Sequence, residues 1–240
     1  MAEPVSKDPA RIAGMFDAIA RRYDLLNHLL SAGLDRSWRR RAIQSLRIAG
    51  HETLLDVCTG TADVALAASG GGTSGPRVRR TIGVDFAVEM LRIGQRKIRD
   101  ANGAPSIWLV RGDASLIPLS DRSVDLATIA FGIRNVQEPS RALREIARVL
   151  KPGGRLAVLE FGDPYVPGLR ELYRWYFRFV LPRVGALVSR HRSAYSYLPA
   201  SVGSFPLPAA FLAQIRAAGF SEAHADPLTL GIVYLYSARK

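Results

Sequence analysis

The alternation of short apolar strands with helical segments between residues 53 and 161 constrains the fold most strongly. Five stretches have the length and composition of strands: 53–58, 80–86, 106–114, 123–131 and 155–161. Helical spacing of apolar residues occupies 64–69, 87–101 and 139–150. This alternation predicts an α/β fold with a mostly parallel sheet and helices on both faces. Two more strands, an antiparallel hairpin at the sheet edge, are expected in residues 221–240, which makes a seven-stranded sheet.

The N-terminal part has a different pattern. Apolar residues recur at helical spacing through residues 12–46 and predict at least two helices, divided near residues 31–37. We therefore expect an N-terminal helical extension over residues 1–48, serving as a cap over the substrate, and a main domain over residues 49–240. A chain of 240 residues is long enough for one substantial core.

Composition limits the partners and the compartment. The net charge of +12 favours contact with something anionic, either nucleic acid, a lipid surface or an acidic substrate. A single cysteine, Cys58, excludes an intramolecular disulfide and a cysteine-based metal cluster. The sequence has no signal-peptide core and no uncharged apolar run of roughly 18 residues. We expect a cytoplasmic protein, with peripheral contact at the inner membrane face as a further option.

Residues 54–63, "LLDVCTGTAD", combine a strand, a glycine turn and the start of a helix. Gly60 would let a ligand approach the backbone, and the helix start offers free N–H groups. The turn has one glycine where the dinucleotide pattern G-x-G-x-x-G has three, which argues against NAD. Asp56 before a turn of small residues suits a nucleoside that carries an amino acid. A turn built only for packing is the alternative.

Acidic residues follow two further strands. Asp85 ends the second strand and can accept the hydroxyls of a ribose. Asp113 and Ala114 end the third strand, where an adenine ring would lie. Each acid alone could be a helix cap. Together, Asp56, Asp85 and Asp113 at three successive strand ends favour a single ligand site on one rim of the sheet.

These motifs resemble a known class. The order of "LDVCTGTAD", "GVDF", "GDA" and "VLKPGGRLAVLEF" resembles the Rossmann-like class I methyltransferases that depend on S-adenosylmethionine. "FDAIARRYDLLNHLLSAGLDRSWRR" and "FGIRNV" are similar, more narrowly, to the menaquinone/ubiquinone biosynthesis C-methyltransferase family. The resemblance runs from about Phe16 to the C-terminus. It implies S-adenosylmethionine as the cofactor, no metal, and cofactor contacts at Gly60, Thr61, Asp85, Phe86, Asp113 and Ala114.

One position departs from the family pattern. Ala130 stands directly before "FGIRNV", where the family often has serine. A hydroxyl contact to the cofactor is therefore absent or replaced by backbone, with an expected effect of about 1 kcal/mol at most.

The resemblance implies methylation of a ring carbon of a polyprenylated quinol. The short N-terminus and "CTGTAD" look more like members that act only on demethylmenaquinol than like those of the ubiquinone pathway, which methylate a benzoquinol. Another small phenol, a nucleic acid and a non-catalytic cofactor-binding role are the alternatives. The nucleic-acid alternative lacks an Asn-Pro-Pro-Tyr type loop at the fourth strand. The sequence leaves the oligomeric state open.

Residues 131–136, "FGIRNV", place Arg134 and Asn135 directly after the fourth strand. Ligands bind where the strand order reverses, here between the first and fourth strands. We expect Arg134 to stabilise a deprotonated quinol and Asn135 to orient it. The alternative for Arg134 is a structural ion pair with an acid such as Asp125 or Glu138.

Two further features remain open. His28 and Asp24 are candidate proton acceptors. Arg170, Arg174 and Arg178 recur every four residues beside aromatic residues, a pattern typical of a helix at a lipid headgroup interface. A core helix with a solvated arginine face is the alternative. The basic cluster at residues 36–41 is either a second lipid contact or a helix end stabilised by its cations.

Overall fold

The protein is described by a computed structural model that places the backbone of residues 7–70, 77–101, 106–180, 183 and 192–240. Its strands are β1 (Thr53–Val57), β2 (Arg80–Asp85), β3 (Ile107–Arg111), β4 (Val124–Ala130), β5 (Leu150–Phe161), β6 (Ser221–Leu228) and β7 (Val233–Arg239). Its α-helices are α1 (Pro9–Leu30), α2 (Leu34–Ser45), α3 (Asp63–Ala68), α4 (Val88–Asp100), α5 (Pro139–Val149), α6 (Leu169–Trp175), α8 (Arg192–Gly203) and α9 (Pro208–Ala217). Short 3-10 helices span Ile133–Asn135 and Thr229–Gly231, and a π-helix spans Tyr176–Val180.

Within the described residues, the seven strands form one sheet in the order β3-β2-β1-β4-β5-β7-β6. The first five strands pair in parallel, and β7 pairs antiparallel with both β5 and β6. The predicted sheet and its terminal hairpin are therefore confirmed. The strand order reverses between β1 and β4, so the carboxyl ends of these two strands border the crevice that such sheets use for ligands.

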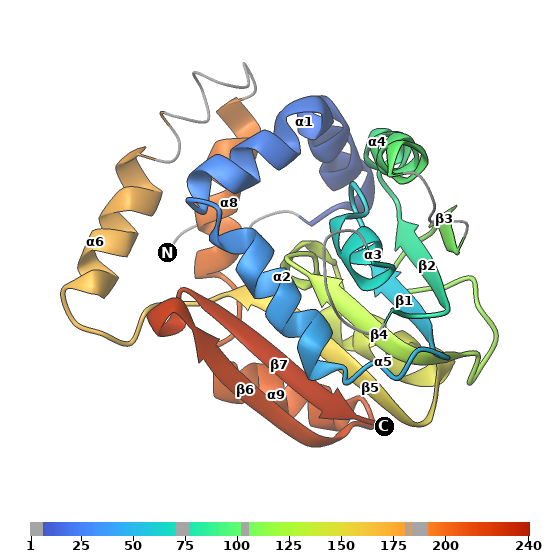
Figure 1. The fold of residues 1–240 in the computed structure, drawn as a ribbon. Helices are drawn as coiled ribbons and strands as arrows, with labels where there is room; N and C mark the ends of the chain where they lie inside the picture. Colours follow the sequence, from blue (N-terminus) through green and yellow to red (C-terminus); the bar gives the residue numbers. More distant parts are fainter. Residues whose placement is uncertain (1–6, 71–76, 102–105, 181–182, 184–191) are drawn as a thin grey trace.

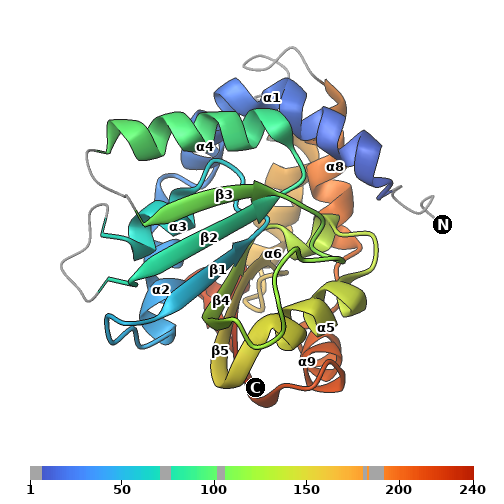
Figure 2. The ribbon, with the colours of Figure 1, turned by 90° about the vertical axis from the view of Figure 1, so that its right-hand side faces the viewer.

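Helices cover both faces of the sheet (Figure 2). On one face, α2 and α3 bury Trp38, Ile43 and Val64 against Leu54 and Leu126 of the central strands. On the other face, α5 and α9 pack against the same strands, with apolar residues such as Leu143, Ile146, Phe211 and Ile215 fully buried. The central strand β1 is buried along its whole length, as a parallel strand covered on both sides should be.

The third group of helices lies at the carboxyl end of the parallel strands. Figure 1 shows α1, α6 and α8 gathered at one end of the sheet. Helix α1 packs on α4, and Asp17 of α1 accepts a hydrogen bond from the backbone N–H of Glu89 in the first turn of α4 (2.8 Å). The predicted division at residue 48 stays a prediction, because α2 shares its core with the sheet while α1 covers the strand ends.

Several sequence features lie elsewhere than expected or outside the described residues. Helix α8 was not predicted, because Pro199 lies inside it. Pro182, where the sequence predicts a break, and half of the glycine-rich segment at residues 69–80 lie outside the described residues. The cluster at residues 36–41 lies in the middle of α2 rather than at its end, so the helix-end explanation for its cations is wrong.

No single helix among the described residues has the length and apolar character to cross a membrane, although one pair, Tyr197–Gly203 and Pro208–Ala217, bent by 75°, meets those criteria jointly.

Candidate active site

A large cavity opens at the carboxyl end of the sheet. Its volume is about 420 Å³, and α1, α2, α6, α8 and the ends of β4 and β5 contribute its walls. The walls are mostly apolar and aromatic: Met15, Phe16, Ile19, Tyr23, Leu34, Trp38, Phe131, Phe161, Leu169, Leu172, Tyr173, Trp175, Tyr176, Tyr197, Leu198 and Ile232. Arg134 is among the few charged residues in these walls. Such a cavity suits a large apolar ligand with one polar anchoring point.

A second, smaller cavity of about 40 Å³ adjoins the first at the ends of β1, β2 and β4. Its walls are Phe16, Tyr23, Cys58, Gly60, Asp85, Phe86, Met90, Ala130, Phe131, Gly132 and Asn135. Phe16, Tyr23 and Phe131 line both cavities, so one thin aromatic wall separates them.

The glycine turn and Asp85 form the floor of the small cavity. Gly60 has a positive φ of 55°, and a side chain added there would meet no atom within 4 Å. Asp85 Oδ2 accepts from the backbone N–H of Gly60 (2.8 Å), and its Oδ1 accepts from that of Ala87 (2.9 Å). Burial raises the pKa of Asp85 despite these bonds. Because a carboxylate has about four acceptor sites, it can still accept two hydroxyl groups.

These residues fit the nucleoside end of S-adenosylmethionine. Open backbone at Gly60 admits a close ligand, and Asp85 is a buried acceptor for ribose hydroxyls. The small cavity nevertheless has far less volume than the 300 Å³ or more that ligand pockets usually have. Phe16 and Tyr23 of α1 line this cavity together with Gly60 and Asp85.

Thr61 points away from this floor. Its hydroxyl donates to Asp24 Oδ1 (2.6 Å), and Asp24 is in turn paired with Lys97 of α4 (2.9 Å). Lys97 also pairs with Asp63 at the start of α3. The predicted cofactor contact at Thr61 therefore stays a prediction, and the candidate proton acceptor Asp24 is occupied by an ion pair that ties α1 to α4.

The three acids lie at the carboxyl ends of the adjacent strands β1, β2 and β3, but they differ in burial and in contacts. Their common role in one ligand site stays a prediction. Asp56 lies within β1 and is almost completely buried, where it accepts from the hydroxyls of Thr59 (2.6 Å) and Thr128 (2.7 Å). Burial raises the pKa of Asp56 to about 6, although these hydroxyls lower it. Among the described residues that line the small cavity, Asp85 is the only one of the three acids.

Asp113 and Ala114 also lie apart from the small cavity. Asp113 is exposed and accepts from the backbone N–H of Ser115 (2.7 Å), which is a local turn contact. Ala114 is buried in the core that α5 covers. Their predicted contact with an adenine ring stays a prediction. Phe86 does line the small cavity, and so does Ala130, the residue that differs from the family pattern.

Arg134 is buried in the wall of the large cavity and is paired with Glu160. Its Nη1 donates to Glu160 Oε1 (2.6 Å) and to the carbonyl of Phe131 (2.6 Å). Its guanidinium lies 5.3 Å from the centre of the Phe161 ring. The ion pair with an acid that the sequence left open is therefore present, but the acid is Glu160. The two acids named as examples have other partners, since Asp125 pairs with Lys151 and Glu138 pairs with Arg141.

Asn135, the next residue, lines the small cavity instead. Its Oδ1 accepts from the hydroxyl of Tyr197 on α8 (3.1 Å), and its Nδ2 donates to the carbonyl of Phe131 (3.4 Å). Adjacent residues thus face adjacent cavities, with Arg134 toward the large one and Asn135 toward the small one.

The remaining candidate, His28, lies at the end of α1, where its Nδ1 is 3.1 Å from Asp35 Oδ1. Sequence reasoning missed Phe16, Tyr23, Tyr197 and Glu160. Tyr23 has helical spacing with Met15 and Ile19, and such spacing by itself indicates only a helix face that packs on the core. Among the described residues, no group of three or more His, Cys, Asp or Glu side chains is placed to hold a metal ion.

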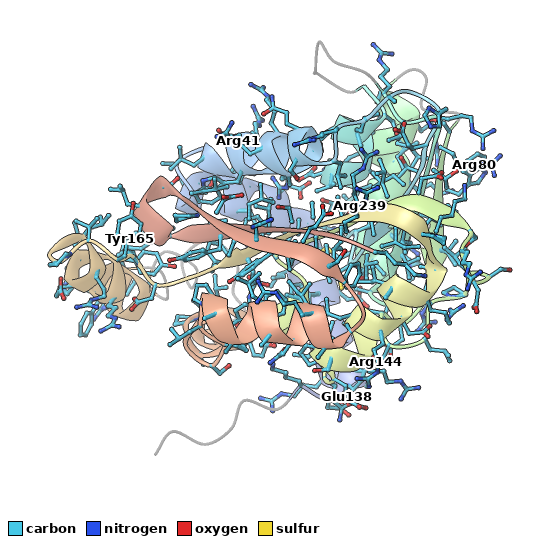
Figure 3. The ribbon with its side chains drawn as sticks, turned by 90° about the horizontal axis from the view of Figure 1, so that it is seen from below. Arg41, Arg80, Glu138, Arg144, Tyr165 and Arg239 are labelled. Atoms are coloured by element: carbon cyan, nitrogen blue, oxygen red, sulfur yellow. The ribbon has the colours of Figure 1, made fainter. Side chains whose placement is uncertain are left out.

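The positive charge is distributed over several faces of the molecule. Figure 3 shows exposed arginines on four different elements, with Arg41 on α2, Arg80 on β2, Arg144 on α5 and Arg239 on β7. The exposed cations of the described residues thus lie on several elements and not on a single helix or strand.

The comparison with known proteins agrees with this geometry. The sequence profile of the ubiE/COQ5 methyltransferase family matches residues 5–240. The chain belongs to this family. The protein named "Ubiquinone/menaquinone biosynthesis C-methyltransferase UbiE" of Syntrophotalea carbinolica is 48% identical over 223 residues, which cover 93% of this chain and 91% of that protein. The "Demethylmenaquinone methyltransferase" of Clavibacter sepedonicus is 39% identical over all of this chain and 94% of that protein.

Solved structures show the same fold at low sequence identity. The [4+2]-cyclase SpnF matches all of this chain and 97% of its own with a TM-score of 0.70 and 19% identity. A Thermotoga maritima S-adenosylmethionine-dependent methyltransferase, described as a possible histamine N-methyltransferase, matches 95% of this chain and 99% of its own with a TM-score of 0.64 and 19% identity. The fold is thus the Rossmann-like fold of class I methyltransferases. As a member of the ubiE/COQ5 family, the chain is a methyltransferase with S-adenosylmethionine as its cofactor.

Proposed function

We propose that this chain methylates a ring carbon of a polyprenylated quinol and that demethylmenaquinol is its substrate. The observation that carries the proposal is the pair of adjoining cavities. An apolar cavity of about 420 Å³ with Arg134 in its wall adjoins a small one that Gly60 and Asp85 line. The names of the relatives from Syntrophotalea carbinolica and Clavibacter sepedonicus support a quinone as the substrate class.

The chemistry explains the need for a buried cation. When bound, S-adenosylmethionine supplies a methyl group on a positively charged sulfur, and the electron pair of the broken bond stays with the sulfur. A quinol ring carbon attacks readily only when a ring hydroxyl has lost its proton. A phenol titrates near pH 10, and an opposite charge nearby typically lowers such a pKa by 1–3 units. An arginine guanidinium carries a positive charge, so Arg134 can stabilise the quinolate.

The other residues of the site position the quinol and exclude water. Tyr197 holds the side-chain amide of Asn135, which can then orient a quinol oxygen near the boundary between the cavities. Phe16, Tyr23 and Phe131 keep that boundary apolar, and a site without water favours a reaction that joins an anion to a cation. The ring carbon gains the methyl group and loses its hydrogen as a proton, so one proton leaves the site per turnover.

A single-turnover assay tests the proposal. Purified protein with labelled S-adenosylmethionine is mixed with reduced demethylmenaquinol in detergent, and in parallel with the benzoquinol of the ubiquinone pathway. Mass analysis of the products is expected to detect methylated naphthoquinol only. Methylation of both rings would mean a dual enzyme. No product from either ring, with the cofactor still bound, would refute the quinol proposal.

The role of Arg134 is tested in the same assay. Arg134→Met is expected to abolish turnover while calorimetry still detects cofactor binding, because the small cavity does not include Arg134. Arg141→Met is the matched control, since Arg141 is half-exposed and has only a distant acidic partner, Glu138 (3.9 Å). Turnover retained in Arg134→Met would remove the proposed role.

We also propose that the mouth of the large cavity rests on an anionic membrane surface, from which the prenyl tail enters. Large apolar residues are exposed on the elements that surround this mouth: Leu25, Leu29, Leu34, Tyr165, Leu172, Trp175, Phe179 and Leu230. Figure 3 places Tyr165 beside α6, the helix that carries Leu172 and Trp175. An exposed apolar patch of this kind suits a lipid interface.

The cations for such contact come from α2 rather than from α6. Arg170 and Arg174 are paired with Glu171 and Asp163, and the side chain of Arg178 lies outside the described residues. Arg36, Arg40 and Arg41 on α2 are exposed, whereas Arg39 of the same cluster turns inward to Asp35 and Asp63. Each arginine near an anionic membrane contributes roughly 1 kcal/mol to binding.

Vesicle sedimentation tests the membrane contact. Trp175→Ser is expected to weaken binding to phosphatidylglycerol vesicles severalfold, because Trp175 is 53% exposed at the mouth. Trp108→Ser is the matched control, since Trp108 is 47% exposed but lies on β3, under Arg80. Equal losses in both variants, or no loss in either, would contradict a docking surface at the mouth.

A further inference from the structure

Glu160 lies at the end of β5 and is completely buried. Its Oε1 accepts from Arg134 Nη1 (2.6 Å) and from the backbone N–H of Phe161 (2.9 Å). Its Oε2 faces the backbone N–H of Arg134 (3.3 Å). One carboxylate therefore contacts both the side chain and the main chain of Arg134, across 26 residues of sequence.

These contacts fix how Arg134 is oriented. The guanidinium is held by Glu160 on one side and by the Phe131 carbonyl through the same nitrogen, and it lies over the Phe161 ring. Its Nε is buried and has no hydrogen-bond partner among the described residues. A buried N–H without a partner is unfavourable, and native structures rarely leave one unless a ligand or water completes it. Arg134 lines the large cavity, so its charge acts on a quinol bound there.

The charge of Glu160 also matters for the reaction. A buried ion pair has no net charge, so Glu160 offsets part of the field with which Arg134 would stabilise an anion. The carboxylate lies behind Arg134 and is absent from the described residues that line the large cavity, so it acts on the quinol through Arg134.

We propose that Glu160 is a positioning residue for methyl transfer, which aims Arg134 at the quinol oxygen and moderates the strength with which Arg134 favours the deprotonated quinol. This inference rests on the quinol methyltransferase function proposed above. It assigns a role in the reaction to a residue that does not itself touch the reacting atoms.

Six other titratable groups lie near the pair of Glu160 and Arg134, and their titration must be distinguished from that of a bound phenol. Five of them have a pKa that burial raises, so they stay neutral near pH 7: Tyr23 on α1, Cys58 after β1, Tyr173 on α6, Tyr197 on α8 and Tyr236 on β7. The sixth is Lys7, ahead of α1, and burial lowers its pKa. Lys7 is the group that could titrate in the same range as a bound phenol.

The test is an optical titration of a bound phenol that requires neither cofactor nor turnover. 1-Naphthol is bound to the full-length protein, and the naphtholate absorbance is followed against pH in wild type, Glu160→Gln and Arg134→Met. We expect the midpoint in Glu160→Gln to lie about 1 pH unit or more below wild type, because a negative charge next to Arg134 is removed. The midpoint in Arg134→Met should rise. Repeating the series in a Lys7→Met background, in which this amine cannot titrate, should give the same shifts.

Glu160→Asp tests the aiming role and remains informative if Glu160→Gln fails to fold. Aspartate keeps the charge but is one methylene shorter, so the guanidinium loses its fixed direction. We expect kcat for methyl transfer to fall ten- to a hundredfold, with the KM for S-adenosylmethionine unchanged and the naphthol midpoint near that of wild type.

Three outcomes would overturn the inference. They are an unchanged or higher naphthol midpoint in Glu160→Gln, wild-type kcat in Glu160→Asp, and complete loss of turnover in a folded Glu160→Gln that binds the cofactor. The last would make Glu160 the proton acceptor instead. Failure of wild type to methylate any quinol would refute the proposed function alone, because the titration still reports on the pair of Glu160 and Arg134.

Discussion

Asp56 should make the protein less stable as the pH rises from 4 to 7. Burial raises the pKa of this carboxyl from 3.8 to about 6 in the folded state. Between these two values the folded protein binds a proton that the unfolded chain has released, so the free energy of unfolding falls with increasing pH. A shift of about two units, at about 1.4 kcal/mol per unit, corresponds to about 3 kcal/mol above pH 7.

Asp56→Asn should remove this dependence. The amide keeps the shape of the carboxyl, and it can accept from one of the two hydroxyls of Thr59 and Thr128 and donate to the other. The variant and wild type should have similar stability near pH 4, and the variant should be more stable by up to about 3 kcal/mol at pH 8. Urea denaturation followed by tryptophan fluorescence, at intervals from pH 4 to pH 8, gives both curves.

Asp125 provides a control of opposite sign. Burial alone would raise its pKa, but hydrogen bonds from Lys151 and from the backbone N–H of Thr53 outweigh burial and lower the pKa. Its stabilising effect is therefore present near neutral pH and lost as the pH falls through its folded-state pKa, so Asp125→Asn should be the less stable protein at pH 7 and equal to wild type in acid. A stability difference between Asp56→Asn and wild type that does not change with pH would refute the reasoning, because it would mean that Asp56 does not titrate in this window.

Four other perturbations have outcomes that the structure defines. Gly132→Ala should lower the free energy of unfolding by about 3 kcal/mol in urea denaturation, because its methyl group would overlap the Cβ of Cys58. Gly14→Ala, inside α1 with open space around it, should instead be neutral or stabilising by up to about 1 kcal/mol. The Cys58 thiol, whose pKa burial raises well above its usual value, should stay unreactive to Ellman's reagent at pH 8 until the protein is unfolded. Lys97→Met should destabilise the protein by about 1 kcal/mol by removing the partner of Asp24, and high salt should reduce the difference between variant and wild type.

The fold could be predicted because its signals are local. A strand buried on both faces reads as a continuous apolar run, and β1 is such a strand. The hydrophobic spacing along α1 and α2 likewise marks two helices and the turn between them. Helix α8 was not predicted because a proline usually ends a helix, whereas α8 continues through Pro199.

The location of a site residue could be predicted only where it depends on the local sequence and not on contacts with distant residues. Asp85 and Asp56 look alike in sequence, since each comes near the end of an apolar strand. Thr128, which lies 72 positions from Asp56, helps to enclose its carboxyl, whereas Asp85 stays at the edge of the small cavity. The pairing of Glu160 with Arg134 likewise depends on a contact between residues that are distant in sequence. In sequence Glu160 is the next-to-last residue of a strand, and only the pairing of β4 with β5 brings it to Arg134.

The backbone at the end of β4 holds Arg134 and Asn135 at the border of the two cavities. Phe131 follows β4 with a positive φ of 58°, and Cys58 follows β1 with a φ of 53°. For residues other than glycine such conformations cost on the order of 1–3 kcal/mol and persist only where the surroundings impose them. The Phe131 ring packs 4.7 Å from that of Phe161, and its N–H donates to the carbonyl of Leu159 (2.8 Å). Held in this way, Phe131 aims its carbonyl at the side chains of both Arg134 and Asn135. One carbonyl at the end of β4 thus holds both a cation and an amide, which line the large and the small cavity, respectively.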